Sequence, residues 1–119
     1  MTATLASITV DCDDVERVAR FWAAALDRKL GEDPTPYFAS LAPAEPAQPI
    51  WMFLKVPEPK TAKNRVHLDL TAPDRDAEVA RLVELGATRI REVTEHGMSW
   101  VVMNDPEGNE FCVARASDH

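Results

Sequence analysis

The sequence predicts an α+β fold built from two βαβββ modules that repeat with pseudo-twofold symmetry. Segments that alternate between apolar and polar residues occur in both halves, and an amphipathic helix follows the first such segment of each half. The sequences of the two halves also align. The segment 67–70 aligns with 7–10 at an offset of 60 residues (67 − 7 = 60), and Val-Ala-Arg at 18–20 recurs at 79–81 at an offset of 61 (79 − 18 = 61). We expect curved mixed sheets from the two modules to enclose one cup.

Length and composition are those of one small globular domain. The 119 residues are 45% hydrophobic and 28% charged, which is an ordinary globular balance. We expect a single domain over 1–119, with internal modules at about 1–57 and 64–116. The segment 57–64 between them contains two prolines, two lysines and an asparagine and is predicted to be a linker.

Charge and cysteine content narrow the possible partners and the compartment. The formal net charge of −7 disfavours nucleic acid and anionic membranes as partners. The N-terminal residues lack the basic region and apolar run of a signal peptide, and no segment has membrane-spanning length, so we expect a cytoplasmic protein. Cys12 and Cys112 form no C-x-x-C pair and are predicted to be small buried side chains in a reducing compartment.

The first module begins with a strand over 5–12, in which apolar residues at even positions alternate with Ser7, Thr9 and Asp11. Asp13 is predicted to cap the following helix, with Glu16 three residues later as in a capping box. The apolar stripe of that helix is Val15, Val18, Ala19, Trp22, Ala25 and Leu26. Further strands are predicted over 37–42 and 50–56.

The second module begins with a strand over 65–71, which places Arg65, His67 and Asp69 on one face. A helix is predicted to start at Pro73-Asp74 and to end at Gly86. Strands should follow over 88–94, 98–104 and 110–115. The last two are joined by the turn sequence Asp-Pro-Glu-Gly-Asn at 105–109.

The polar strand faces define the candidate site, because the apolar faces should pack on the helices. We expect the following side chains to face the cup: Ser7, Thr9, Asp11, Arg65, His67, Asp69, Glu110 and Cys112, with Trp51, Phe53 and Lys55 from the first module. His67 is the strongest candidate for a catalytic role, with Asp69 orienting its imidazole. Trp51 and Trp100 could form an apolar wall for a planar ligand. The alternatives are a solvated sheet surface, a simple Arg65–Asp69 pair and ordinary packing of the tryptophans.

Four segments carry a family resemblance that covers nearly the whole chain: RFWAAAL at 20–26, RVHLDL at 65–70, ARLVELGAT at 80–88 and NDPEGNEFCV at 104–113. They resemble the vicinal oxygen chelate superfamily, which includes glyoxalase I, extradiol dioxygenases, fosfomycin-resistance proteins and bleomycin-binding proteins. The small glyoxalase-like domain proteins are the most similar subtype. Asp-Pro-x-Gly-Asn followed by an apolar strand is the most specific of these motifs.

The resemblance implies positions for metal ligands, and this sequence departs from them. Metal-binding members take a His from the first strand, a His from the strand that opens the second module and a Glu from the last strand. These positions carry over to Ser7, His67 and Cys112, so only His67 matches. Glu110 lies two residues too early. We therefore expect no tightly held metal, although His67 and Cys112 with Asp69 or Glu110 could form a soft divalent-metal site.

The resulting functional prediction is a glyoxalase/bleomycin-resistance-like protein that binds a small organic molecule without the classical metal site. Apolar contacts would come from Trp51, Phe53 and Trp100, and polar contacts from Ser7, Thr9, Arg65, His67, Asp69 and Cys112. The alternative is a small lyase or isomerase that uses His67 as a general acid/base, with or without a metal. Members of the family are frequently dimeric, so the resemblance also implies a homodimer.

Overall fold

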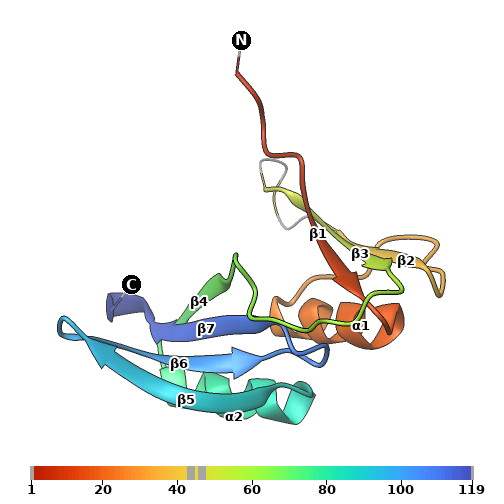
Figure 1. Ribbon diagram of the computed structural model, residues 1–119. Coiled ribbons are helices and arrows are strands. Elements are labelled where there is room, and N and C mark those ends of the chain that lie inside the picture. The colour runs from red at the N-terminus through yellow and green to blue at the C-terminus, as the bar shows by residue number, and fades with distance from the viewer. Residues whose placement is uncertain (1, 43–44, 46–47, 119) are drawn as a thin grey trace. The chain divides into compact units, whose positions relative to one another are not determined.

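The computed structural model describes residues 2–42, 45 and 48–118 (Figure 1). The chain divides into two compact units, Met1–Pro59 and Lys60–His119, and the boundary falls inside the predicted linker. Each unit has its own sheet and its own α-helix. The α+β class is therefore confirmed, and enclosure of a common cup by the two sheets stays a prediction. Neither α-helix in the described part of the chain is long and apolar enough to cross a membrane.

The first unit consists of β1 (Ser7–Cys12), α1 (Val15–Ala25), β2 (Phe38–Leu41) and β3 (Ile50–Lys55). The sheet order is β1-β3-β2, with β1 parallel and β2 antiparallel to β3. Helix α1 packs against this sheet with its predicted apolar stripe. Trp22 is 2% exposed and its ring lies 5.2 Å from that of Trp51, which makes this pair the centre of the unit's core.

Helix α1 starts one residue later than the sequence predicts. The N-cap is Asp14, whose Oδ1 accepts a hydrogen bond from the backbone N–H of Arg17 at 3.2 Å. The predicted cap, Asp13, instead forms an ion pair with the Nζ of Lys55. Val15 is 1% exposed and occupies the first helical position, so burial of this side chain decides which of the two neighbouring aspartates reaches the first turn.

The first unit has two strands after its helix in the described residues, where the βαβββ pattern predicts three. At the expected place an isolated bridge joins Leu30 to Leu41, and Gly31 N–H donates to the carbonyl of Ser40. A Cβ at Gly31 would collide with the side chain of Ser40, so glycine permits this close approach. Pro34 and Pro36 follow and lack the backbone N–H that a longer strand would need.

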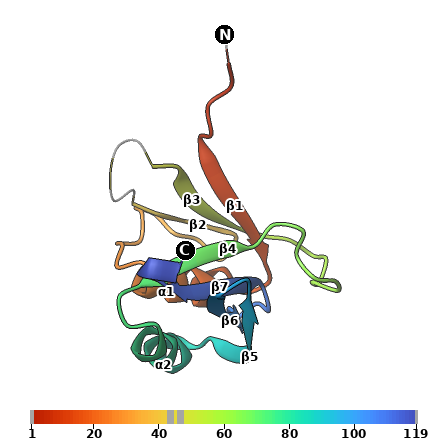
Figure 2. The ribbon, with the colours of Figure 1, turned by 90° about the vertical axis from the view of Figure 1, so that its left-hand side faces the viewer.

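The second unit consists of β4 (Leu68–Ala72), α2 (Arg75–Leu85), β5 (Thr88–Glu95), β6 (Met98–Asn104), β7 (Glu110–Arg115) and a short 3-10 helix (Ala116–Asp118). The sheet order is β4-β7-β6-β5, with only β4 and β7 parallel among these neighbours. Both views show α2 along one face of this sheet (Figures 1 and 2). Buried residues of β6 and β7, among them Met103, Phe111 and Val113, form the core beneath it.

The ends of α2 are as predicted, whereas the strand before it is shorter. Asp74 caps the helix by accepting from the N–H of Ala77 at 3.1 Å, and Gly86 ends it at a φ of 126°. Strand β4 begins at Leu68 and not at residue 65, so Arg65 and His67 precede the strand. The backbone N–H of Asn64 donates to the carboxylate of Glu110 rather than to a strand carbonyl, because the chain enters the sheet as a loop here.

Candidate functional site

The face of the second sheet opposite α2 carries the candidate site. Side chains in register on neighbouring strands share a face, and one such row runs Asp69, Cys112, Val102, Arg91 across β4, β7, β6 and β5. A groove of about 640 Å³ lies over this face. We call it the open-face groove; its lining includes Lys63, His67, Asp69, Arg91, Val93, Trp100, Val102, Glu110 and Cys112.

Three of the predicted site residues meet at one end of the row. His67 Nε2 lies 3.4 Å from Asp69 Oδ1, and both side chains are almost half exposed. Cys112 lies beside them, 8% exposed, and one potential ligand atom from each of the three falls within 4.8 Å of the others. Asp69 therefore lies beside His67, one of the two partners that the sequence left open for it. Arg65, the alternative partner, is exposed and lies outside the groove lining.

The environment of Cys112 keeps its thiol protonated. Burial raises the pKa of this thiol, and the charge of Asp69 and a hydrogen bond with it raise the pKa further. The positive charges of Lys63 and Arg91 oppose this shift but do not cancel it. At neutral pH the groove floor thus presents a neutral S–H group and not a nucleophilic thiolate.

Alkylation of Cys112 should be slow near neutral pH and should accelerate only above the pH range of a free thiol, because its folded pKa is raised. Asp69→Asn should move the rate profile to lower pH, since it removes the negative charge beside the sulfur. The measurement is iodoacetamide labelling of Cys12→Ser protein, with Asp11→Asn as the control that should leave the profile unchanged. A rate profile that stays unchanged in Asp69→Asn would contradict the assignment of Asp69 as a cause of the raised pKa.

The raised pKa of Cys112 also makes the stability of the fold depend on pH. The stability that this thiol contributes is fully present below its unfolded pKa and is lost as pH rises through the folded pKa.

Glu110, which the sequence left open as a possible metal ligand, instead binds Lys60 and the backbone of Asn64. Burial alone would raise its pKa, but hydrogen bonds from Lys60 Nζ at 2.9 Å and from the backbone N–H of Asn64 outweigh burial and lower the pKa. The carboxylate is therefore engaged with the chain that leads into β4. Of the two candidate carboxylates, Asp69 joins His67 and Cys112. No sequence motif marks Lys60 as the partner of Glu110, because fifty residues separate them.

The donor set determines which metal the groove would suit. Imidazole, carboxylate and thiolate are all zinc ligands, and three protein ligands with one open position are usual in reactive zinc sites. His67, Asp69 and Cys112 would hold such an ion, which as a Lewis acid would polarise a bound oxygen. The classical ligand positions do not fit, because Ser7 supplies a hydroxyl and Cys112 a thiol. Binding would require Cys112 to lose its proton, so metal affinity would rise with pH.

In the first unit, the structure differs from the predicted site at Trp51 and Phe53. Trp51 and Phe53 are in register with Ile8 and Val10, on the face that packs against α1. Phe53 is fully buried and Trp51 is 7% exposed beside Trp22, so the structure places both in the core and not on the polar face. The expectation that they line the ligand site with Ser7 and Thr9 was wrong.

Ser7 and Thr9 do lie on the face of the first sheet away from α1. Their register partners there are Ile50 and Met52, which belong to the apolar strand β3. Lys55, also predicted to face the cup, has its Nζ hydrogen-bonded to the carbonyl of Asp13 at 2.9 Å. The ligand roles predicted for Ser7 and Thr9 stay predictions.

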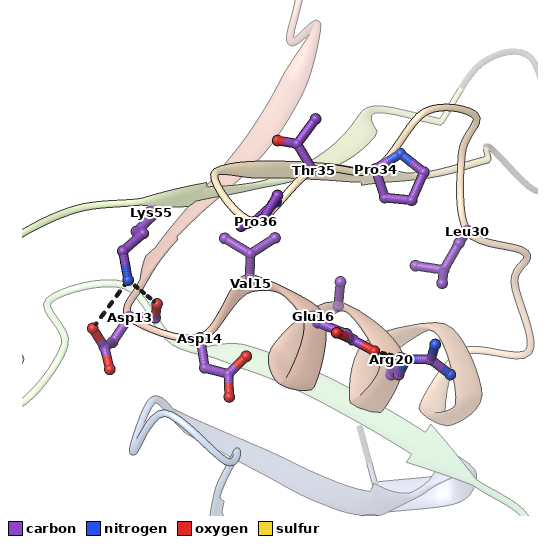
Figure 3. Close-up of a pocket in the computed structure, with 11 residues that line it drawn as sticks. Asp13, Asp14, Val15, Glu16, Arg20, Leu30, Pro34, Thr35, Pro36 and Lys55 are labelled. Atoms are coloured by element: carbon purple, nitrogen blue, oxygen red, sulfur yellow. Dashed lines mark hydrogen bonds and ion pairs between the residues drawn. The ribbon is translucent and has the colours of Figure 1, made fainter.

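A second pocket, of about 620 Å³, lies in the first unit between the start of α1 and the segment around Pro34 (Figure 3). Four of its five charged side chains are paired with one another, Lys55 with Asp13 and Arg20 with Glu16 at 3.1 Å, and the fifth, Asp14, caps α1. These exposed pairs leave little unsatisfied charge for a ligand. The open-face groove is therefore the better candidate, since it has cations without an ion-pair partner among the described residues.

Two helix-backed sheets, one of which carries a groove of apolar and polar side chains on its open face, define an α+β protein of the vicinal oxygen chelate class. A family model described as "Glyoxalase-like domain" matches residues 7–114, so the chain belongs to this family. A search of curated proteins found no match.

Solved structures show the same fold at low sequence identity. A glyoxalase/bleomycin resistance protein/dioxygenase family enzyme from Burkholderia phytofirmans PsJN has a TM-score of 0.77 and 19% identity, over 95% of this chain and 98% of that chain. A glyoxalase-related enzyme from Fulvimarina pelagi has a TM-score of 0.73 and 18% identity, over 98% and 90%. The fosfomycin resistance protein FosX from Mesorhizobium loti has a TM-score of 0.72 and 14% identity, over 98% and 94%.

Proposed function

We propose that this protein binds a small organic molecule in the open-face groove of its second unit. The observation that carries the proposal is the composition of that groove. An apolar wall of Val93, Trp100 and Val102 stands beside the polar group of His67, Asp69 and Cys112. Pockets that combine mostly apolar lining with a few convergent polar groups are typical of small-molecule sites.

Each part of the groove has a separate role in binding. Trp100 is only partly buried and would provide a flat apolar surface for a planar ligand. His67 and Asp69 would exchange hydrogen bonds with a polar substituent, and the thiol of Cys112, whose S–H donates to Asp69, adds a weak sulfur acceptor. None of these interactions needs a metal ion, which agrees with the departure of Ser7 and Cys112 from the classical ligand pattern.

Names of structural neighbours are compatible with binding as the function. One neighbour is described as a fosfomycin resistance protein and another as a glyoxalase/bleomycin resistance protein/dioxygenase family enzyme. Binding that sequesters a small molecule is compatible with such names. The alternative, a lyase or isomerase with His67 as acid/base, uses the same side chains, and the word enzyme in the names of two neighbours is equally compatible with it.

The test is a calorimetric titration with 2-naphthol, a planar neutral probe. Wild-type protein should bind it with unchanged affinity in the presence of EDTA, and Trp100→Ala should weaken binding about tenfold or more, equivalent to about 1.4 kcal/mol. Tyr37→Ala is the matched control, since Tyr37 is a 67% exposed aromatic residue of the first unit. Absence of binding, or equal affinity of wild type and Trp100→Ala, would refute the proposal.

A further inference from the structure

We propose that the open-face groove selects an organic anion, specifically a planar aromatic carboxylate, whose charged group is bound by Arg91 with help from Lys63 while its ring lies on Trp100. This inference rests on the proposed function and specifies the ligand class of the same site. It is carried by the register of the sheet, by the ion pairs of the groove residues and by a bulge in β5.

The register sets Arg91 beside the aromatic wall. Arg91 pairs with Val102, and the next row on the same face pairs Val93 with Trp100. Successive rows on one face are two residues apart, or about 7 Å along the strand. The guanidinium of Arg91 and the indole of Trp100 thus belong to adjacent rows, a separation that suits a ligand with a carboxylate attached directly to its ring.

The cations of the groove are available to a ligand. Glu110 forms an ion pair with Lys60 at 2.9 Å, and Asp69 lies 3.4 Å from His67, which balances the charge of Asp69 when the imidazole is protonated. By contrast, neither Arg91 nor Lys63 forms an ion pair in the part of the chain that the structure describes, although both line the groove. Their charges reach the groove floor, because both oppose the rise in the pKa of Cys112.

One further carboxylate sets the orientation of the ligand. Glu95 also lines the groove, and it is in register with Met98 beyond the row of Val93 and Trp100. Arg91 and Glu95 therefore lie on opposite sides of the aromatic row. A carboxylate on the ligand would be attracted to the Arg91 side and repelled from the Glu95 side, so the ring would be held over Trp100 in one direction.

A β-bulge explains why Arg91, and not its neighbour Arg89, serves the groove. The register shifts between these two residues, so Arg89 pairs with Met103 while Arg91 pairs with the adjacent Val102. Met103 is fully buried on the helix side, whereas Val102 lines the groove. In a regular strand Arg89 and Arg91 would share a face; the bulge redirects one of them. Arg89 instead lies 3.7 Å from Glu92.

The experiment compares three probes of one shape: 2-naphthoate, neutral 2-naphthol and cationic 2-naphthylmethylamine, each titrated calorimetrically at low salt. Wild-type protein should bind naphthoate about tenfold or more tightly than naphthol, and the amine most weakly. Arg91→Gln should abolish the preference for naphthoate and keep naphthol binding. Arg89→Gln, the matched control with the same change in net charge, should keep the preference. Added salt should reduce the preference, because partly exposed charges are screened.

The outcomes separate this inference from the proposed function. Equal affinity for the three probes, with Trp100→Ala still weakening all of them, would overturn anion selection and leave small-molecule binding intact. A preference lost equally in Arg89→Gln and Arg91→Gln would overturn it as well, because net charge would then be its cause. Failure of every probe to bind would overturn both. Circular dichroism of each variant checks that the exposed substitutions leave the fold unchanged.

Discussion

Replacing Trp51 with alanine should lower the free energy of unfolding of the first unit by about 3–5 kcal/mol and leave probe binding in the open-face groove unchanged. Trp51 is 7% exposed, and its ring lies 5.2 Å from that of Trp22 and 6.3 Å from that of Phe53. Alanine would leave a cavity at the centre of this aromatic cluster, since the flanking rings are held by the helix and the sheet. Urea unfolding followed by circular dichroism measures the loss.

Trp100→Ala should give the opposite result and serves as the comparison. Trp100 is only partly buried and lines the groove, so its removal should weaken binding of 2-naphthol far more than it lowers stability. The assignment of Trp51 to the core would be wrong if Trp51→Ala unfolded at the wild-type urea concentration. It would also be wrong if Trp51→Ala weakened naphthol binding as strongly as Trp100→Ala does.

The second large effect is expected at Asp105, the first residue of the turn between β6 and β7. Its side chain is almost fully buried, and its carboxylate accepts hydrogen bonds from the N–H of Glu107 at 2.8 Å and the N–H and Nδ2 of Asn109 at 2.9 and 3.2 Å. Asp105→Ala would leave these donors unsatisfied. A hydrogen bond to a charged group contributes about 1.5–3 kcal/mol, and the freed donors of this part-buried turn would regain some of that by bonding to water. We therefore expect Asp105→Ala to lower the free energy of unfolding by about 2–4 kcal/mol in total.

Two variants sharpen this prediction. Asp105→Asn keeps one side-chain acceptor oxygen and should lose less than half as much stability as Asp105→Ala. Asp11→Ala removes an exposed aspartate and should stay within about 0.5 kcal/mol of wild type. Equal losses in Asp105→Ala and Asp11→Ala, measured by urea unfolding, would show that the buried hydrogen bonds of the turn contribute nothing.

Local patterns predicted most elements of the second unit. The strands over 98–104 and 110–115 have the predicted bounds, and Asp74 and Gly86 begin and end α2 as expected. These predictions depend on neighbours in the sequence. They use the alternation within a strand, a capping side chain that accepts a hydrogen bond from the N–H three residues later, and a glycine that adopts a positive φ. Interactions of this range are visible in a one-dimensional pattern.

The sequence patterns failed where the alternative strand faces were equally apolar or the alternative residues were equally polar. Strand β3 is apolar at nearly every position, so alternation could not tell which of its faces meets α1, and Trp51 was assigned to the wrong one. Asp13 and Asp14 are both good caps, and burial of Val15 chose between them. Asp69 and Glu110 are both acidic, and a lysine distant in sequence, Lys60, engaged the second.

Arg91 is the functional candidate that sequence reasoning missed. In a regular strand Arg91 would share a face with Arg89. No sequence pattern around Ile90 predicts the bulge that places the two arginines on different faces. The bulge exists only as a mismatch between two paired strands, so it cannot be predicted from one of them.

The amino-acid sequence was thus sufficient for the family, the α+β class and the turn at 105–109, because motifs and alternation patterns within short segments of the chain indicate each of them. The tertiary structure decided which aromatic residues form the core, which carboxylate joins Cys112 and which arginine faces the groove. Each of those choices depends on the register between strands, and register is set by contacts between residues far apart in the sequence.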